Sequence, residues 1–381
     1  MKNENWIKYL IVFVILMSFT MITSCNFIMK NKDVKSSDLT FYTGTSSGAE
    51  SDGIYKISMN NGGQFTKVKK TANTDRPSFL AYSPGRHFLL NINEHQKNDG
   101  MGGMESWKIM DDSLDFVSRS VSGGGHPCFI TAGDSGFVLT ANYTGGNVGL
   151  LKVSAEGKLS ELLDLQQHEG DSVSPRQDAP HAHSAWFEPD GSGIIAADLG
   201  TNELWFYRLD MTAQKLVTWP PGKLAMAPGA GPRHLAFHPN QKWIYIINEL
   251  NSTVTLLQKA GGSVFEIVAS VTTLPEDYAG DNSCAHIVVS GDGRFCYASN
   301  RGHNTIGIFS IDAASGKLSP IGHAPVHGNW PRHFALSPDE DFLIVANRWS
   351  GNLVSFKRDA ETGLLEYVDQ TQLREPVCVL F

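Results

Sequence analysis

Short stretches in which apolar residues alternate with polar ones recur along this chain, separated by turns rich in Gly, Asp, Asn and Pro. Two copies read PRHLAFHPNQKWIYIINE (residues 232–249) and PRHFALSPDEDFLIVANR (331–348), each a strand, a turn and a second strand. Alternation of this kind between turn residues is typical of β-hairpins. The second strands of six copies end in Asn or Asp at intervals of 49, 56, 50, 52 and 47 positions, at Asn93, Asn142, Asp198, Asn248, Asn300 and Asn347.

A β-rich repeat with a period of about 50 residues predicts the blades of a propeller rather than a helical solenoid. Each copy continues with a third strand, such as STVTLLQK (252–259). A fourth strand follows a G-x-L turn, as in SGKLSPI (315–321). Because each copy supplies four strands, we expect each to form one four-stranded antiparallel blade.

The two ends of the repeat region complete each other. The final residues, EPVCVLF (375–381), look like a first strand, and residues 39–58 supply a second and a third strand without a first. Pairing of Val377–Val379 beside Thr40–Tyr42 would close this blade and remove the exposed sheet edges of an open ring. The sequence therefore predicts an all-β fold, a seven-bladed β-propeller over residues 39–381 that its N- and C-terminal strands close.

The N-terminus is expected to be a targeting segment rather than part of the fold. Its apolar run, Tyr9–Met21, is shorter than the ~20 residues that a transmembrane helix needs. The run is followed by ITSC, which resembles the lipobox of bacterial lipoproteins. We expect residues 1–24 to be a signal peptide, Cys25 to carry a lipid that anchors the chain to a membrane, and residues 25–38 to be a tether. The body would then lie in the cell envelope, on its periplasmic or surface side; an uncleaved anchor and a plain signal peptide are the alternatives.

Composition adds two limits to this interpretation. The net charge is −8, with acidic and basic residues mixed along the chain, so nothing indicates a nucleic-acid partner. Apart from Cys25, the cysteines show no CxxC or zinc-site spacing, and we expect them to be small buried residues rather than a disulfide framework; they are Cys128, Cys284, Cys296 and Cys378. The sequence implies no metal and no organic cofactor.

Hairpin geometry brings ionisable residues together at one end of each blade. The first strand starts where the second strand ends, so Arg233 should lie near Asn248 and Glu249. The symmetry of a propeller then gathers the equivalent residues of all blades at one mouth of the central channel. Histidine exchanges protons near neutral pH, and arginine binds carboxylates or phosphates with two hydrogen bonds. We expect a functional ring at this mouth, formed by His181, His183, Arg233, Glu249, His286, Arg301, Arg332 and His333.

Other polar positions have structural explanations. The recurring Asn or Asp should terminate its strand and bond the following turn. His238 lies in a hairpin turn and is expected to be exposed. Arg233 and His234 alternate along a strand, so only one of them should face the channel.

The chain resembles the lactonase family, the bacterial 6-phosphogluconolactonases of the propeller type. The resemblance rests on GAGPRHLAFHPNQKWIYIINELNSTV (229–254), RQDAPHAHSAWFEPDGSGIIAADLGTNELWFYRLD (176–210) and GRFCYASNRGHNTIGIFSID (293–312), and further matches extend it from about residue 39 to the end. The family also includes a fungal carboxymuconate-lactonizing enzyme on the same fold.

The resemblance implies roles for particular residues of the ring. Carried over by motif, the catalytic group falls on His183, Arg233 and Glu249, with Arg301 beside them. The substrate-binding residues would be His181, His286, Arg301, Arg332 and His333. This chain departs from the family at Ala285-His286-Ile287, where relatives usually have an acidic residue between Ala and Ile. The charge at that position is therefore reversed or removed.

The leading interpretation is a hydrolase that opens a sugar-acid lactone. This reaction needs a base that activates water and a group that stabilises the oxyanion. His183 would be the base, Arg233 and Arg301 would bind negative charge, and Glu249 would hold Arg233 in a salt bridge. Because 6-phosphogluconolactone is a cytosolic intermediate, an exported enzyme fits another aldonolactone or a muconolactone-like acid better. The alternatives are a non-catalytic propeller that binds carbohydrate or protein, which His286 favours, and a muconolactone cyclase-type enzyme.

If Cys25 carries the lipid anchor, Cys25→Ser should abolish acyl labelling and release the protein from membranes. Metabolic labelling with an alkyne fatty acid, followed by membrane fractionation, measures both effects. Cys128→Ser is the matched control and should leave both unchanged. A Cys25→Ser protein that still sediments with membranes would place the anchor elsewhere.

Overall fold

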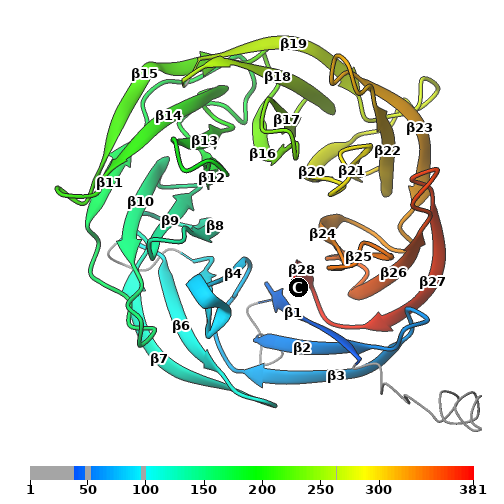
Figure 1. Cartoon of the computed structure of the whole chain (residues 1–381), viewed down its shortest axis with the longest axis horizontal. Coiled ribbons are helices and arrows are strands. Elements are labelled where there is room, and N and C mark those ends of the chain that lie inside the picture. Colours follow the sequence, from blue (N-terminus) through cyan, green and yellow to red (C-terminus); the bar gives the residue numbers. More distant parts are fainter. Residues whose placement is uncertain (1–37, 48–52, 96–99, 263) are drawn as a thin grey trace, which may run out of the picture. The chain divides into compact units, whose positions relative to one another are not determined.

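The computed structural model describes residues 38–47, 53–95, 100–262 and 264–381. Leu39–Phe381 form one compact unit, and its described residues make seven four-stranded antiparallel sheets arranged in a ring (Figure 1). The predicted seven-bladed β-propeller is therefore confirmed. The signal peptide, the lipidated Cys25 and all of the tether except Asp38 lie outside the described residues. No helix in the described part of the chain is both long enough and apolar enough to cross a bilayer.

Each blade has the same strand order from the channel outward. The first strands, which line the channel, are β4 (Leu80–Tyr82), β8 (Pro127–Ala132), β12 (Ala182–Phe187), β16 (Pro232–Phe237), β20 (Ser283–Val289), β24 (Pro331–Leu336) and β28 (Pro376–Leu380). The second strands are β5 (Phe88–Asn93), β9 (Phe137–Asn142), β13 (Ile194–Asp198), β17 (Trp243–Asn248), β21 (Phe295–Arg301), β25 (Phe342–Asn347) and β1 (Leu39–Thr45).

The outer half of each blade completes the sheet. The third strands are β6 (Gly103–Ile109), β10 (Asn147–Lys152), β14 (Glu203–Asp210), β18 (Thr253–Gly261), β22 (Thr305–Ile311), β26 (Asn352–Arg358) and β2 (Ile54–Met59). The fourth strands, at the rim, are β7 (Leu114–Val121), β11 (Asp164–Gln167), β15 (Lys215–Ala225), β19 (Val264–Thr272), β23 (Leu318–Pro325), β27 (Leu365–Gln372) and β3 (Phe65–Ala72). A short 3₁₀ turn, Pro84–Arg86, joins β4 to β5.

The core lies between the blades rather than within one layer. Second strands such as β9 and β17 are buried along their whole length because a neighbouring blade covers each face. Fourth strands have an exposed face, and Phe116 on β7 is 53% exposed. Seven apolar clusters, each built from two adjacent blades, follow one another round the ring without a break. Burial of these faces is the main stabilising contribution of the fold.

The N- and C-terminal strands close the ring, as predicted, but in a different register. β28 pairs antiparallel with β1, and the partner of Cys378 is Gly44 rather than a residue of Thr40–Tyr42. Pro376 lies opposite Thr45 in the same way that Pro232 lies opposite Asn248. Thr45 therefore occupies the place that Asn holds in other blades. The register was mispredicted because β1 lacks that Asn.

The recurring Asn and Asp residues have the structural role that the sequence indicated. The Nδ2 of Asn248 donates hydrogen bonds to the hydroxyls of Thr253 and Thr255, both at 2.9 Å. Oδ1 of Asp198 accepts hydrogen bonds from the backbone N–H groups of His181 and Thr201, at 2.8 and 2.9 Å. These bonds tie the end of the second strand to the neighbouring turns.

Two further expectations concern buried positions. The four cysteines of the described chain are buried free thiols, as predicted; they are Cys128, Cys284, Cys296 and Cys378. The expectation that His238 is exposed is wrong, because its side chain packs against the next blade. Its Nε2 lies 3.0 Å from the carbonyl oxygen of Gly293, and its Nδ1 accepts a hydrogen bond from the N–H of Asn240.

Because β28 completes the last blade, deletion of residues 376–381 should abolish cooperative thermal unfolding. The deletion exposes the edge of β1 and removes the contact between the rings of Phe41 and Phe381, whose centroids are 4.9 Å apart. Circular dichroism melting curves measure the effect. Val217→Ala, on an exposed face of β15, is the control and should keep the wild-type transition. A sharp transition in the truncated chain would show that the ring does not need this closure.

Candidate active site

A bulge near the start of the first strand redirects side chains in six blades. The register slips there, so one or two residues have no partner on the second strand; they are Cys128, His183, Arg233, Ala285 with His286, Arg332 and Val377. A β-bulge inserts an extra residue and changes the direction of a side chain. As a result, Arg233 and His234 do not point to opposite sides of the strand, and the prediction that they alternate is wrong. Nη1 of Arg233 lies 3.4 Å from Nε2 of His234.

The carboxylate of Glu249 is the centre of the site. It follows the terminal Asn248 of β17 and is 3% exposed. Its Oε1 accepts a hydrogen bond from Nη1 of Arg176 at 2.6 Å. Its Oε2 forms ion pairs with Nη2 of Arg301 at 2.8 Å and with Nε of Arg233 at 2.9 Å. Three guanidinium groups thus converge on one buried carboxylate, including the expected pair with Arg233.

Backbone and aromatic groups hold these arginines in place. Nε and Nη2 of Arg301 donate to the carbonyl oxygens of Ser283 and Cys284 at 3.0 and 2.7 Å. Nη1 of Arg233 donates to the carbonyl oxygen of Ala285. Both groups therefore bond the start of β20 as well as Glu249. Nη2 of Arg176 donates to the hydroxyl of Tyr143 at 3.0 Å.

A cavity of about 220 Å³ lies at this cluster, and residues from several blades line it. They are Glu94, His126, Cys128, Tyr143, Thr144, Arg176, His183, Glu249, Arg301 and Arg332. Four of the predicted site residues are among them: His183, Glu249, Arg301 and Arg332. Arg233 is buried against Glu249 and does not line the cavity. His181 stacks on Tyr143, with ring centroids 4.3 Å apart, at the edge of the cavity.

His286 and His333 lie elsewhere in the channel. They line a second cavity of about 310 Å³, together with Phe79, Phe129 and Trp186 among others. The structure therefore does not place His286 in one pocket with His183 and Glu249. Cys284 pairs with Asn300 as Pro232 pairs with Asn248, so Ala285 falls at the position of Arg233, and His286 at that of His234.

His234 connects the two cavities. Its ring centroid lies 5.3 Å from that of His183 and 5.1 Å from that of His286. The Nδ1 atoms of His234 and His286 are 2.8 Å apart, within hydrogen-bond distance. His286 in turn stacks on His333 at 3.9 Å. A line of four histidines therefore runs along the channel from the cavity beside Glu249 to the second cavity.

Burial and the arginines determine the charge states at the site. Burial, and then Arg233, hold the pKa of His183 well below its ordinary range, so this imidazole is neutral at neutral pH. Burial alone would raise the pKa of Glu249, but Arg301, Arg233 and Arg176 together hold it well below the ordinary value. Burial, and then Arg301, lower the pKa of Arg233 to about 9, which leaves it cationic. Burial raises the pKa of Cys128, so this thiol is not an activated nucleophile.

Hairpin geometry gathers Glu94 and Tyr143 at this mouth, and both line the cavity, but they were not chosen as site residues from the sequence. Glu94 follows Asn93 as Glu249 follows Asn248, and it forms an ion pair with Arg332 at 3.1 Å. Tyr143 follows Asn142 in the same way. The position after the terminal Asn of each second strand was therefore the available signal.

Arg176 had no repeat signal because it lies in the long connection between β11 and β12. The neighbouring Gln177 anchors this connection. It is fully buried, and its Nε2 donates to the carbonyl oxygen of Leu199 at 2.8 Å and to Oδ1 of Asn202 at 3.2 Å. Arg176 itself is 49% exposed and covers the cavity from one side.

The site is cationic although the whole chain is acidic. Four arginines face two glutamates here, which leaves an excess of positive charge in a chain of net charge −8. Bidentate arginines bind carboxylate, phosphate or a developing oxyanion. Within the described residues, no group of three or more His, Cys, Asp or Glu side chains is arranged to hold a metal ion. Fold and site together define a seven-bladed β-propeller with a small polar cavity suited to an anionic ligand.

Comparisons with known proteins identify the family. The family model "Lactonase, 7-bladed beta-propeller" matches residues 40–381. The 6-phosphogluconolactonase of Bacillus subtilis (strain 168) is 36% identical over 346 residues, which cover 89% of this chain and 97% of that protein. The 6-phosphogluconolactonase of Formosa agariphila is 34% identical over 300 residues, covering 77% and 84%. The structure of a periplasmic gluconolactonase of Pseudomonas aeruginosa matches with a TM-score of 0.86 at 29% identity, over 90% of this chain and 98% of that one. This chain belongs to the lactonase family of seven-bladed β-propellers, as its motifs indicated.

Loss of the Glu249 charge should destabilise the fold in a pH-dependent way. Glu249→Gln leaves buried arginines without their carboxylate, a change that costs roughly 3–5 kcal/mol of unfolding free energy for buried pairs. The folded-state pKa of Glu249 is lowered, so its stabilising contribution is full above the unfolded value of about 4.3 and is lost as the pH falls through the folded value. Urea unfolding between pH 3 and pH 8 should show a wild-type advantage that is constant at neutral pH and shrinks in acid.

Glu276→Gln, at an exposed loop position, is the control for this series and should follow the wild type at every pH. Equal stability of Glu249→Gln and wild type at pH 7 would contradict the network described here.

Proposed function

We propose that this chain is a lactonase that hydrolyses a sugar-acid lactone in the cavity beside Glu249. The observation that carries the proposal is a buried, neutral imidazole, His183, in the same small cavity as the guanidinium groups of Arg301, Arg332 and Arg176. A base and fixed positive charge are the two groups that hydrolysis of a lactone requires. The names of the Bacillus and Formosa relatives support this class of reaction.

His183 has the geometry of a general base. Its Nδ1 lies 3.7 Å from the buried Sγ of Cys128, and no hydrogen bond occupies its Nε2 within the described residues. Nε2 would accept a proton from a water molecule as that water adds to the lactone carbonyl carbon. Collapse of the tetrahedral intermediate breaks the ring C–O bond, and the proton on His183 passes to the leaving alkoxide. The product is the open hydroxy acid.

The arginines would stabilise the negative charge that forms on the carbonyl oxygen. Arg301 is held at one position by three contacts, so it needs little reorganisation when the charge develops. Glu249 aligns the guanidinium groups, and Arg233 positions Glu249 from behind without reaching the cavity. Arg233 is therefore a positioning residue in this proposal. Arg176 and Arg332 would bind the carboxylate of the product.

The position of His286 weakens the case for a propeller that only binds ligands. Its departure from the family pattern suggested such a function, but its side chain lines the second cavity and not the one beside Glu249. The neutral base His183, the carboxylate of Glu249 and the guanidinium of Arg301 are all present at the cavity of this chain. A hydrolase is consequently the function that the cavity supports best.

We infer an extracytoplasmic location and an unphosphorylated substrate. The lipobox at Cys25 predicts export, and the Pseudomonas relative is named a periplasmic gluconolactonase. Glucono-1,5-lactone and similar aldonolactones occur outside the cytoplasm, whereas sugar phosphates are retained inside it. The cavity of about 220 Å³ suits a single sugar ring.

His183→Ala should lower kcat on glucono-1,5-lactone by about 10²–10⁴-fold, the range for loss of a general base. Because burial and Arg233 lower the pKa of His183 well below 6.5, wild-type kcat/KM should stay flat from pH 8 to pH 6 and fall only in more acidic solution. A pH-stat with subtraction of spontaneous hydrolysis measures both. His87→Ala, an exposed histidine beside the 3₁₀ turn, is the control and should keep full activity. Full turnover by His183→Ala would rule out this base, and absence of lactone hydrolysis by the wild type would rule out the proposed function.

A further inference from the structure

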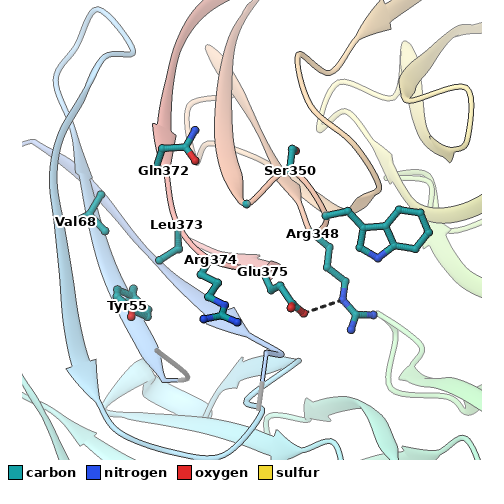
Figure 2. Close-up of a pocket in the computed structure, with 10 residues that line it drawn as sticks. Tyr55, Val68, Arg348, Ser350, Gln372, Leu373, Arg374 and Glu375 are labelled. Carbon is teal, nitrogen blue, oxygen red and sulfur yellow. Dashed lines mark hydrogen bonds and ion pairs between the residues drawn. The ribbon is translucent and has the colours of Figure 1, made fainter. Parts of the chain in front are cut away.

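An open groove of about 600 Å³ lies on the propeller between its first and last repeats, apart from the two channel cavities. It is bounded by the turn between β25 and β26, by the connection between β27 and β28, and by β2 and β3 (Figure 2). Its lining residues are Tyr55, Val68, Arg348, Trp349, Ser350, Gly351, Gln372, Leu373, Arg374 and Glu375. Arg348 follows the terminal Asn347 and Glu375 precedes the first strand β28, so both lie at the same end of their blades as Glu249.

An exposed tryptophan pair forms one wall of this groove. Trp349 is 59% exposed, and its ring stacks on that of Trp330 with centroids 3.6 Å apart and an angle of 14° between the planes. One face of Trp349 is thus covered by Trp330, which supports it as a flat platform. Trp349 therefore presents one flat aromatic face to solvent at the wall of the groove.

The same pair links the groove to the active-site cavity. The guanidinium carbon of Arg301 lies over the ring of Trp330, 5.1 Å from its centroid. Arg301 lines the cavity beside Glu249, and Trp349 lines the groove. Trp330 holds a φ of +69° at the residue before Pro331, the position that His126 holds with a φ of +49° in its own blade. This turn directs the residue before the first strand toward the mouth of the channel.

Planar polar groups occupy the rest of the groove. Nε of Arg348 lies 3.3 Å from Oε2 of Glu375, and the two side chains are about one-third exposed. Figure 2 shows Arg374 beside Glu375, and Gln372 further along the same connection. Both Arg374 and Gln372 are exposed. An aromatic face with amide, guanidinium and carboxylate groups around it matches a sugar ring, which presents apolar C–H faces and a rim of hydroxyls.

We propose that the groove is a second sugar subsite and that the substrate is the lactone of an oligosaccharide aldonic acid. The lactone ring at the former reducing end occupies the cavity beside Glu249. The next sugar unit lies beside Trp330, and the third unit stacks on the exposed face of Trp349, because that face is turned away from Trp330 and Arg301. This inference rests on the proposed lactonase function and specifies its substrate class. A protein partner would need a broader apolar surface than one supported indole among charged side chains.

The test compares a trisaccharide lactone, cellotriono-1,5-lactone, with glucono-1,5-lactone on the full chain. Wild type should show a kcat/KM about tenfold higher for the trisaccharide, because its third ring gains a stacking contact that glucono-1,5-lactone lacks. Trp349→Ala should remove this preference while hydrolysis of glucono-1,5-lactone stays unchanged. Phe116→Ala removes an aromatic ring of similar exposure on β7, away from the groove, and should leave both rates unchanged.

Binding supplies an independent readout. Titration with cellotrionate, the hydrolysis product, should change the tryptophan fluorescence of the wild type and of Phe116→Ala but leave that of Trp349→Ala unchanged. Wild-type hydrolysis of glucono-1,5-lactone without a preference for the trisaccharide, or with a preference that Trp349→Ala retains, would overturn the subsite and leave the lactonase intact. Hydrolysis of neither lactone would overturn the lactonase and this inference with it.

Discussion

Closure of the ring by β28 and β1 is the constraint on which the rest of the structure depends. Every apolar cluster of this chain is shared by two blades, so no blade can bury its faces alone. The strand that follows the last complete repeat must therefore join a blade that begins at Leu39, across nearly the whole length of the chain. Such pairing between distant segments is slow to form, but once formed it gives the last blade its first strand and covers the inner edge of β1.

The closed ring determines where function can lie. First strands converge on the channel. Regular alternation would bury some of their side chains between blades, but the bulges near the strand starts turn these side chains toward the channel. The bulge at Arg233 brings its guanidinium to Glu249, and the bulge at His183 brings its imidazole to the cavity. Four residues that precede the first proline of a first strand have positive φ, including His126 and Trp330. The bulges and the positive-φ turns that shape each blade thus also position the candidate ligand contacts.

Electrostatics at the centre illustrate how a buried charge can be tolerated. Glu249 is almost fully enclosed, and three arginines compensate the cost of removing its carboxylate from water. Those arginines are themselves held by carbonyl oxygens of β20 and by Tyr143, so few of their donors depend on solvent. A polar network of this kind is fixed before any ligand arrives. Such preorganisation is what stabilisation of an oxyanion requires.

Much of this protein could be predicted from its sequence. The spacing of the terminal Asn and Asp residues predicted the seven blades, because repeated blades place equivalent residues at regular intervals along the sequence. The motifs around His183, Arg233 and Glu249 indicated the family, and hairpin geometry placed Arg233 beside Glu249. These features depend on local residue patterns or on the symmetry of the repeat, and both are visible in the amino-acid sequence.

Tertiary structure alone decided the rest. The predicted ring of site residues is divided between two cavities, and this division depends on the bulges. A bulge adds one residue to a strand, and the alternation of apolar and polar positions in the sequence does not reveal it. Arg176 reaches its site from the long connection between β11 and β12, which lies outside the repeat. Trp349 lies in the turn between β25 and β26, whose residues differ from blade to blade, so the repeat pointed to neither side chain. The register of β28 on β1 was likewise hidden, because the blade that they form has Thr45 where the others have Asn. The sequence determined which elements form, and packing between blades determined which side chains meet, because those contacts join residues that lie far apart in the chain.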